Sequence, residues 1–557
     1  PQGPALFPPR SDEEKAGEGK TGEAKAEGAD KPADKPAPKA PVPAVQVTPE
    51  GFVARTVALP GHKAGTYRAL SAASGALFYI RGGDGDGDGD DPVLLRYDLK
   101  ERKEEKVLDG VTTYALSADG KKLLYRVKDD WFVGEAKAGL KAGEGKLDLS
   151  GLKVKLDLRA EWKQMFEDGW RIARDWFYDP AMHGVDWPAM KARYGALVPF
   201  VAHRSDLDFL LGELLGELEA GHTYVASGDE PRVPRVQGGM LGAELEADGS
   251  GRYRIAKVYP GENWDESGRS PLTETGVDVP AGSFLLAIDG HDLTTRDNPY
   301  RLLENKAGVP VVLKVARTAA GEGAREVTVR PVASEQGLRY LDWVTGRMAL
   351  AERLSGGKVG YIHLPDTSLQ GNRMLQKLFY SQISRPALIV DDRYNGGGFI
   401  PDRMIEYLTR RTLAFWARRG IESMRTPGFA HDGPKAMLIN GYSASGGDAL
   451  PYFFRLNKLG PLVGTRTWGG LIGLSGNPSL MDGGAVQIPT FRIYDTSGQW
   501  VVENEGVQPD VEVVDLPEAR IAGGDPSLEK AVELLLAELA RRPAWPPAVP
   551  APPVMAR

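Results

Sequence analysis

Short apolar runs alternate with longer amphipathic stretches over residues 357–515, and this order predicts strands connected by helices. The predicted strands are Lys358–Leu364, Ala387–Asp391 and Ala436–Asn440, and the predicted helices between them are Gly371–Ser384 and Pro401–Arg410. Strand–helix–strand order implies right-handed crossovers and therefore a mostly parallel sheet. Because sites in such sheets gather at the carboxyl ends of the strands, the residues that follow each run are the first candidates for chemistry.

Residues 159–220 carry apolar side chains at helical spacing. One stripe recurs at steps of three and four positions and consists of Trp162, Phe166, Trp170, Ala173 and Phe177. We interpret this aromatic stripe as helix core rather than as a cofactor-binding surface. A second amphipathic stretch, Leu207–Leu218, ends at Gly221, a typical left-handed helix stop, and His222 follows immediately.

Residues 46–145 contain short β-like runs separated by turns. The segment Ala69–Ala72 returns as Ala115–Ala118, a spacing of 46 residues, close to the propeller-blade period of roughly 40 to 50 residues. Two blades cannot close a propeller, so this is either the end of a longer array, which we favour, or a coincidence. Between two runs, Asp84–Asp91 alternates Asp with Gly. A calcium loop would need a glutamate where Leu95 stands, so we expect a solvated hairpin loop there.

Gly238–Leu245 is glycine-rich, and Ala281–Leu293 has a strand-turn pattern that leads into a predicted helix near Tyr300–Asn305. Together these segments resemble a PDZ domain, which binds a peptide as an added strand at a sheet edge. We therefore expect a multidomain chain of β-propeller blades, a helical domain, a PDZ-like domain and an α/β core with a mostly parallel sheet. The expected segments are a Pro/Ala/Lys/Glu-rich linker (1–45), blades (46–145), helices (146–232), the PDZ-like domain (233–335), and the core with its closing helix and Pro-rich tail (336–557).

Composition narrows the function classes. Among 557 residues, 69 Lys and Arg stand against 76 Asp and Glu, a net charge of −7 without a long basic block, so we expect no nucleic-acid partner. No apolar run approaches the ~20 residues that span a bilayer, so we expect no membrane partner. The absence of cysteine excludes disulfides, thiolate zinc sites and cysteine nucleophiles. We expect a cytoplasmic location. The chain begins with Pro1 rather than Met and looks truncated at its amino end, so a periplasmic or secreted location is the alternative.

Two predicted strand ends carry candidate chemistry. Asp391 is followed by Asp392–Gly398, which ends in three glycines, and Asn440 is followed by Gly441–Asp448, with Ser445 near its middle. Consecutive glycines leave backbone N–H groups unshielded, which suits the binding of an oxyanion. Ser445 stands in a small-residue turn at a predicted helix start, where N–H groups are free, and is a candidate nucleophile. Either segment alone is typical of an ordinary turn. A functional site is favoured because the two segments follow strands of the same predicted sheet.

A serine nucleophile needs a base, and the chain offers seven histidines. His222 is the candidate, since it stands at a helix end flanked by small residues. The other six fall in the blade region, the PDZ-like turn, a strand or polar connections, namely His62, His183, His203, His291, His363 and His431. Glu503 follows a strand-like run and is the candidate acidic partner, with Glu505 as its rival.

Four segments in this order, RYNGGG, NGYSASGGD, ENEGVQPD and the closing DPSLEKAVELLL, make the chain resemble the carboxyl-terminal half of tricorn protease and its bacterial homologues. This family is related to the tail-specific, C-terminal-processing proteases. The resemblance implies a serine peptidase acting on peptides or unfolded polypeptides, without cofactor or metal, and assembled as a homohexamer. It implies Ser445 as nucleophile, His222 as general base, Glu503 as the acidic member, and the amides of Gly398 and Gly446 as the oxyanion hole.

The chain departs from the family pattern at three places. The family often has a serine directly before the histidine, bridging it to the glutamate, where this chain has Gly221; a water or the Thr223 hydroxyl would have to substitute. An acidic residue often follows the nucleophile, where this chain has Gly446. Leu413–Arg419 lacks the acidic residue that accounts for a basic side-chain preference in the archaeal enzyme, so trypsin-like specificity is not expected.

Two other functions remain open at this point. A catalytically decayed peptide-binding scaffold is the alternative suggested by the missing hydroxyl at Gly221. A crotonase-like acyl-transfer enzyme would use similar glycine-rich oxyanion loops, but the PDZ-like insertion disfavours it. Labelling of Ser445 by a fluorophosphonate would separate the peptidase from the scaffold.

Overall fold

The computed structural model describes residues 50–51, 53–61, 65–82, 91–228, 233–543 and 545–555. The predicted linker at 1–45, His62, and all of Asp84–Asp91 except its last residue lie outside the described residues. The chain divides into two compact units, Pro1–Lys155 and Leu156–Arg557. Over the described ranges, no helix has both the length and the apolar character needed to cross a bilayer.

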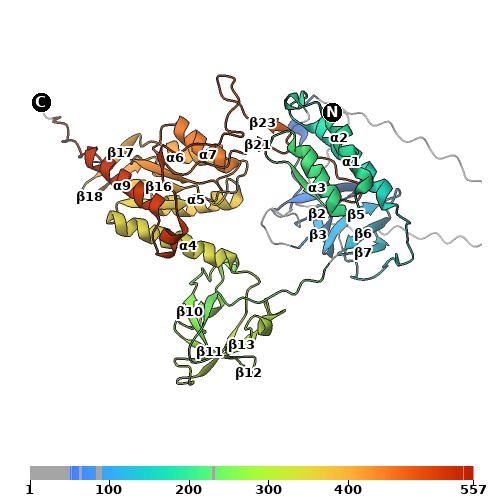
Figure 1. Ribbon diagram of the computed structural model, residues 1–557, viewed down its shortest axis with the longest axis horizontal. Coiled ribbons are helices and arrows are strands. Elements are labelled where there is room, and N and C mark those ends of the chain that lie inside the picture. Colours follow the sequence, from blue (N-terminus) through green and yellow to red (C-terminus); the bar gives the residue numbers. More distant parts are fainter. Residues whose placement is uncertain are drawn as a thin grey trace, which may run out of the picture. The chain divides into compact units, whose positions relative to one another are not determined.

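The first unit contains two antiparallel sheets (Figure 1). Their strands are β1 (Tyr67–Ala73), β2 (Ala76–Arg81), β3 (Val93–Asp98) and β4 (Lys103–Asp109) in one sheet, and β5 (Val111–Leu116), β6 (Lys122–Val127) and β7 (Asp130–Glu135) in the other. The Tyr114 hydroxyl lies 2.5 Å from the carbonyl oxygen of Ala69 and 2.7 Å from that of Phe78, which joins the sheets. The repeated Ala-Leu-Ser-Ala segments fall in β1 and at the end of β5, the first strand of each sheet, as expected for successive blades.

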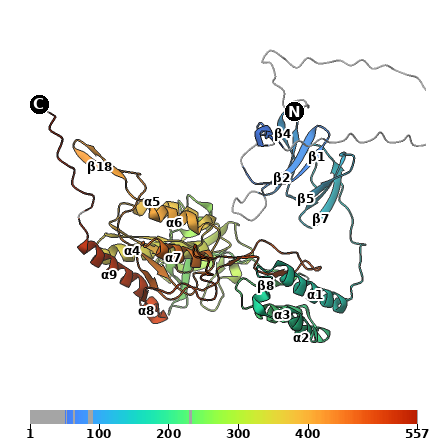
Figure 2. The same cartoon turned by 90° about the horizontal axis from the view of Figure 1, so that it is seen from above.

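The second unit begins with three helices, α1 (Leu158–Trp176), α2 (Trp187–Gly195) and α3 (Arg204–Gly216). The predicted aromatic stripe is buried among them, which confirms its interpretation as core. Three residues from far along the chain, Leu480, Val486 and Ile488, complete this core. Next to α3, β8 (Tyr224–Ala226) pairs antiparallel with β22 (Ala485–Gln487), so the helical segment and the carboxyl-terminal half are joined by a sheet. Figure 2 shows β8 beside α3.

An antiparallel sheet with the order β14-β13-β11-β10-β9, and with β12 paired to β11, forms the PDZ-like part. Its strands are β9 (Ala243–Ala247), β10 (Tyr253–Val258), β11 (Phe284–Ile288), β12 (His291–Asp292), β13 (Val311–Ala316) and β14 (Arg325–Val329). The helix predicted near Tyr300–Asn305 was wrong, since only a three-residue 3₁₀ turn, Arg301–Leu303, forms there. Glu304 is already extended and Asn305 has a φ of 57°, so the segment is too short to nucleate an α-helix.

The α/β core is built on a five-stranded sheet in which every neighbouring pair is parallel, as predicted. In spatial order its strands are β15 (Val359–His363), β16 (Ala387–Asp391), β19 (Lys435–Ile439), β20 (Leu462–Gly464) and β24 (Val511–Glu512). Every residue of β15, β16 and β19 is buried, which is the pattern of a parallel sheet covered on both faces.

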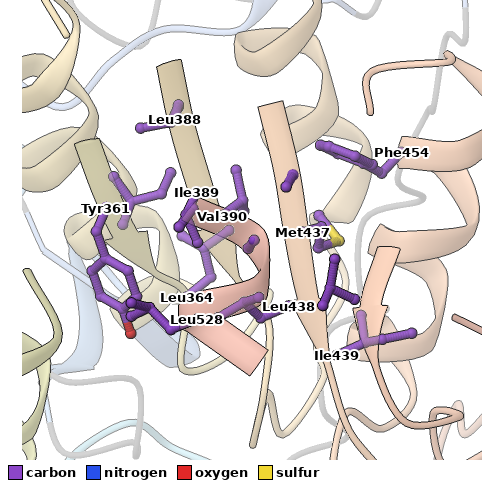
Figure 3. Close-up of a cluster of buried hydrophobic side chains, with 14 of the residues drawn as sticks. Tyr361, Leu364, Leu388, Ile389, Val390, Met437, Leu438, Ile439, Phe454 and Leu528 are labelled. Atoms are coloured by element: carbon purple, nitrogen blue, oxygen red, sulfur yellow. The ribbon is translucent and has the colours of Figure 1, made fainter. Parts of the chain in front are cut away.

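Helices cover both faces of this sheet. They are α4 (Gln336–Ser355), α5 (Leu369–Gln382), α6 (Pro401–Thr409), α7 (Gly446–Leu456) and α9 (Pro526–Arg541), with the short α8 (Pro517–Ile521) before the last. The strands lie side by side in the order in which they occur along the chain. Right-handed crossovers therefore bring α5, α6 and α7 to one face of the sheet, and α4 packs with α9 on the other face. Figure 3 shows Phe454 of α7 and Leu528 of α9 among the apolar side chains of β16 and β19.

Several elements of the core were not identified from the sequence. They are α4, the hairpin of β17 (Ala414–Arg418) and β18 (Ile421–Thr426), and the pair of β21 (Ile472–Gly473) and β23 (Phe491–Arg492). The strands of the last pair have only two residues each, too few to show a period of two. Their pairing depends on contacts between distant parts of the chain.

Candidate active site

Ser445 lies at the tight turn between β19 and α7, at the carboxyl edge of the parallel sheet. Its backbone has φ 57° and ψ −112°, a conformation that non-glycine residues rarely adopt and that often marks functional positions. Its N–H donates to Asp448 Oδ2 at 2.7 Å. The neighbouring Ser443 is fully buried and its hydroxyl donates to the Asp392 carbonyl at 2.8 Å, so of these two serines only Ser445 presents its hydroxyl to a cavity.

The glycine trio after β16 packs directly against this turn. A Cβ on Gly397 would lie 2.7 Å from the Cβ of Ser445, and one on Gly446 would lie 2.5 Å from the carbonyl oxygen of Gly398. Gly397 and Gly398 also have φ of 87° and 138°, which glycine adopts without strain. Among the described residues, no acceptor receives the N–H of Gly398 or of Gly446. Two adjacent amides are therefore available to one ligand oxygen.

His222 stands between α3 and β8, and the pairing of β8 with β22 fixes its place against the core. Its Nδ1 lies 2.9 Å from the Tyr224 hydroxyl, and its ring packs edge-on against Trp468 with centroids 5.4 Å apart. Burial lowers the pKa of His222, because desolvation disfavours the imidazolium. Burial therefore favours the neutral form of this ring more than it is favoured in an exposed histidine.

Glu503 is only 3% exposed and lies beside the residue that precedes His222. The Gly221 N–H donates to Glu503 Oε1 at 2.7 Å, and the buried Oε2 has no hydrogen-bond partner among the described residues. Burial raises the pKa of Glu503, while the Gly221 N–H opposes that shift. Thr223 does not take part in this contact, since its hydroxyl lies 3.5 Å from the Ala220 carbonyl.

Glu503 belongs to a turn, and the strand-like run expected before it forms only a single bridge, between Trp500 and Tyr494. Val502 and Asn504 on either side have φ of 70° and 65°. The Asn504 side chain donates to the Glu219 carbonyl at 2.7 Å, and so the turn is held against the segment that leads to His222. Glu505 is exposed and does not share the buried position of Glu503.

A cavity of about 570 Å³ brings the predicted site residues together. His222, Ser445, Gly398 and Gly446 all line it, whereas Glu503 lies behind Gly221 and does not. Within the described part of the chain, no hydrogen bond joins Ser445 to His222 or His222 to Glu503. Long or unformed catalytic hydrogen bonds are common in ligand-free sites. A larger cavity, of about 810 Å³, is lined by residues that include His183, and it shares Arg492 with the first cavity.

Four of the five other described histidines have local partners elsewhere. His363 is buried, with Nδ1 2.9 Å from the Tyr340 hydroxyl and Nε2 3.0 Å from the Arg393 carbonyl. His431 lies 2.9 Å from the Arg385 carbonyl, and burial lowers its pKa to about 4. His183 Nδ1 lies 2.8 Å from the Leu218 carbonyl, and His203 caps α3. None of these four lines the cavity beside Ser445.

Asp448 is a residue of this site that the sequence analysis missed. Its Oδ2 accepts from Ser445 N and from Gly470 N (3.3 Å), and its Oδ1 accepts from Gly469 N (2.8 Å) and from the Thr467 hydroxyl. It thus joins the Ser445 turn to the loop whose Trp468 packs on His222. An aspartate three residues after Ser445, in the first turn of a helix, is a capping signal that could have indicated it.

Comparison with protein-family models gives three matches along the chain. Residues 158–216 match the tricorn protease C1 domain, residues 239–334 the tricorn protease PDZ domain, and residues 358–513 peptidase family S41. His222 lies just after the first match, and Ser445 and Glu503 lie within the third.

Curated relatives and a solved structure agree with these matches. Tricorn protease homolog 1 of Streptomyces coelicolor is 35% identical over 532 residues, covering 91% of this chain and 49% of the relative. Tricorn protease of Thermoplasma acidophilum is 32% identical over 80% of this chain and 41% of its own length. The crystal structure of the tricorn protease superposes with a TM-score of 0.75 at 28% identity, over 85% of this chain and 47% of that one. The chain thus spans about half the length of the curated relatives it matches, and it belongs to the tricorn protease family.

Proposed function

We propose that this chain carries the catalytic site of a serine-type peptidase that hydrolyses peptide bonds in peptides or unfolded polypeptides. The observation that carries the proposal is the shared cavity, where Ser445, His222 and the two unpaired amides of Gly398 and Gly446 meet. A serine hydroxyl, a neutral imidazole and two aligned N–H donors are the groups that acyl transfer to water requires.

Ser445 is the nucleophile of this proposal. Its Oγ attacks the scissile carbonyl carbon while His222 takes the hydroxyl proton, and the carbonyl oxygen becomes an oxyanion that accepts from the amides of Gly398 and Gly446. The imidazolium then gives its proton to the leaving amine as the C–N bond breaks. A water molecule, deprotonated by the same imidazole, hydrolyses the acyl-enzyme and restores Ser445.

The tautomer of His222 follows from its surroundings. To accept the serine proton at Nε2, the ring must carry its own proton at Nδ1, and the Tyr224 hydroxyl 2.9 Å away is suited to accept from it. Tyr224 would then orient the ring, a part that a carboxylate takes in many triads.

Glu503 acts through the backbone in this proposal. Its carboxylate holds the Gly221 amide and thereby the backbone that leads into His222, and when ionised it adds a negative charge on the side of the residue that precedes the imidazolium. The amide of Gly221 substitutes for the bridging serine hydroxyl seen in much of the family. The missing hydroxyl is therefore compatible with an active site, and a decayed scaffold becomes an outcome of the test.

The test compares peptide hydrolysis by the wild-type chain, by Ser445→Ala and by Ser475→Ala. Ser475 is an exposed serine whose hydroxyl pairs with that of Thr490 and which does not line the cavity, so it is the matched control. We expect Ser445→Ala to abolish hydrolysis with an unchanged fold and Ser475→Ala to retain it. A folded wild-type chain without activity would favour the scaffold, and activity in Ser445→Ala would move the nucleophile elsewhere.

A further inference from the structure

The cavity beside Ser445 has an apolar floor formed by one face of α7. Ala449 and Phe453 follow Ser445 by four and eight residues, so the three side chains lie in line along the helix. The opposite wall comes from the chain around β21 and β23, where Leu471–Leu474 and Phe491–Ile493 line the cavity. A side chain that enters past Ser445 therefore meets hydrocarbon on two sides.

Aromatic rings stand at the entrance of the same cavity. Phe399, directly after the glycine trio, is 78% exposed, and Phe491 of β23 is 47% exposed. Gly473 makes room for the second ring, since a Cβ there would lie within 2.0 Å of it. Exposed aromatic side chains at the rim of an apolar cavity indicate a binding site in which an apolar group of a ligand becomes buried.

Arg492 is the one Asp, Glu, Lys or Arg residue among the described residues that line this cavity. Its guanidinium donates to the Tyr178 hydroxyl at 2.9 Å and lies 5.2 Å from the Trp500 ring centroid. Both of these partners line the larger cavity, and no Asp or Glu among the described residues lines the cavity beside Ser445, so a cation placed there would find no carboxylate partner on the wall. Burial of an unpaired charge is costly, so a lysine or arginine side chain is disfavoured there.

We propose that this cavity binds the side chain of the residue whose carbonyl Ser445 attacks, and that it selects large apolar side chains, aromatic or leucine-like, over small and cationic ones. The inference rests on the proposed function, because the amides of Gly398 and Gly446 place the scissile carbonyl at the cavity mouth. Once the carbonyl oxygen is held there, the side chain on the adjacent Cα reaches the α7 face that Ala449 and Phe453 present.

A set of peptides identical except at that residue tests the preference. With Phe, Leu, Ala or Lys before the scissile bond, we expect kcat/KM for Phe and Leu to exceed that for Ala and Lys by about tenfold or more. Equal rates for the four peptides, or a preference for Lys, would overturn the inference.

Substitutions at two positions test the wall residues themselves. Ala449→Val narrows the cavity one turn below Ser445, and we expect the Phe-to-Ala ratio of kcat/KM to fall about tenfold. Leu456→Ala, on the exposed part of the same helix, is the control and should leave the ratio unchanged. Arg492→Glu should raise the Lys-to-Phe ratio, and Arg492→Met should raise it less. Unchanged ratios in all three cavity variants, with Ser445 still labelled by a fluorophosphonate, would contradict the assignment.

A binding measurement separates this inference from the catalytic proposal. Fluorescence anisotropy with the Ser445→Ala variant reports peptide binding without turnover, and we expect tighter binding of the Phe peptide than of the Lys peptide. If the wild-type chain hydrolyses a denatured protein but the peptides show no apolar preference, only the specificity inference fails. If the wild-type chain neither hydrolyses peptides nor reacts with a fluorophosphonate, the proposed function fails while the binding order still tests the cavity.

Discussion

The Gly221 N–H donates to Glu503 Oε1 at 2.7 Å, and this bond ties the residue before His222 to a buried carboxylate 282 positions further along the chain. Gly221 has no positive φ, so other residues can adopt its backbone conformation. A Cβ built on Gly221 would lie 3.0 Å from Oε1 and 3.7 Å from the unpartnered Oε2. The hydroxyl of a serine at position 221 would therefore lie within reach of Glu503 Oε2.

Gly221→Ser is expected to fold and to raise kcat by a few-fold, because its hydroxyl can donate to Glu503 Oε2 at a net gain of about 0.5–1.5 kcal/mol, or more to a charged acceptor. Gly221→Ala is the matched control, since it adds the same Cβ near Oε1 without a donor. The measurement is the steady-state kcat of Gly221→Ser compared with that of Gly221→Ala. Equal kcat values would show that the hydroxyl adds nothing to the backbone contact.

Glu503→Gln is expected to lose activity substantially, though less than Ser445→Ala, because the carboxylate contacts Gly221 rather than the His222 ring. Removal of the carboxylate in related triads costs up to ~10⁴ in kcat. Glu505→Gln should be nearly silent, since Glu505 is exposed. The measurement is kcat/KM for both variants. A loss of kcat/KM in Glu505→Gln but not in Glu503→Gln would assign the acidic role to Glu505 instead.

The pH dependence of kcat/KM should follow His222. Only the neutral ring accepts the serine proton, so activity falls as the pH drops through the His222 pKa. Burial lowers that pKa, and the acidic limb is therefore expected to have its midpoint below ~6.5, the ordinary value for histidine. If the acidic limb of kcat/KM has its midpoint above ~6.5 while the chain is folded, the His222 ring is not the neutral, desolvated base described here.

Asp448 is expected to act as a positioning residue. Asp448→Asn keeps the size of the side chain, but its amide nitrogen cannot replace the carboxylate oxygen that accepts from the N–H groups of Ser445 and Gly470, or the one that accepts from the Gly469 N–H and the Thr467 hydroxyl. We expect kcat to fall about tenfold or more with little change in KM, because the substrate cavity is intact while the Ser445 turn loosens. Slower fluorophosphonate labelling of folded Asp448→Asn should accompany the lower kcat. A matched fall in thermal stability with unchanged kcat would limit Asp448 to a structural role.

The sequence was sufficient to predict the parallel sheet, the aromatic helical stripe and the blade-like strands, because each has a clear period or an uninterrupted apolar run. It also pointed to Ser445, His222 and the glycine trio, since small residues at strand and helix ends are visible in the chain itself. The apolar wall from Leu471 to Ile493 was not predictable. Its strands have two residues each, and pairing with distant segments holds them in place.

The acidic partner illustrates the same limit. Glu503 and Glu505 could not be separated by strand alternation, and the segment proved to be a turn with positive φ at Val502 and Asn504. What distinguishes the two glutamates is the tertiary contact of Glu503 with Gly221, which no local pattern encodes.

The most direct test of the central claim is mass-spectrometric mapping of a fluorophosphonate adduct on the folded chain. The account predicts a single adduct on Ser445 in the wild-type chain and a much slower reaction in His222→Ala, in which the base is absent. An unlabelled Ser445 in the folded wild-type chain, an adduct on another serine, or equal labelling rates with and without His222 would contradict it.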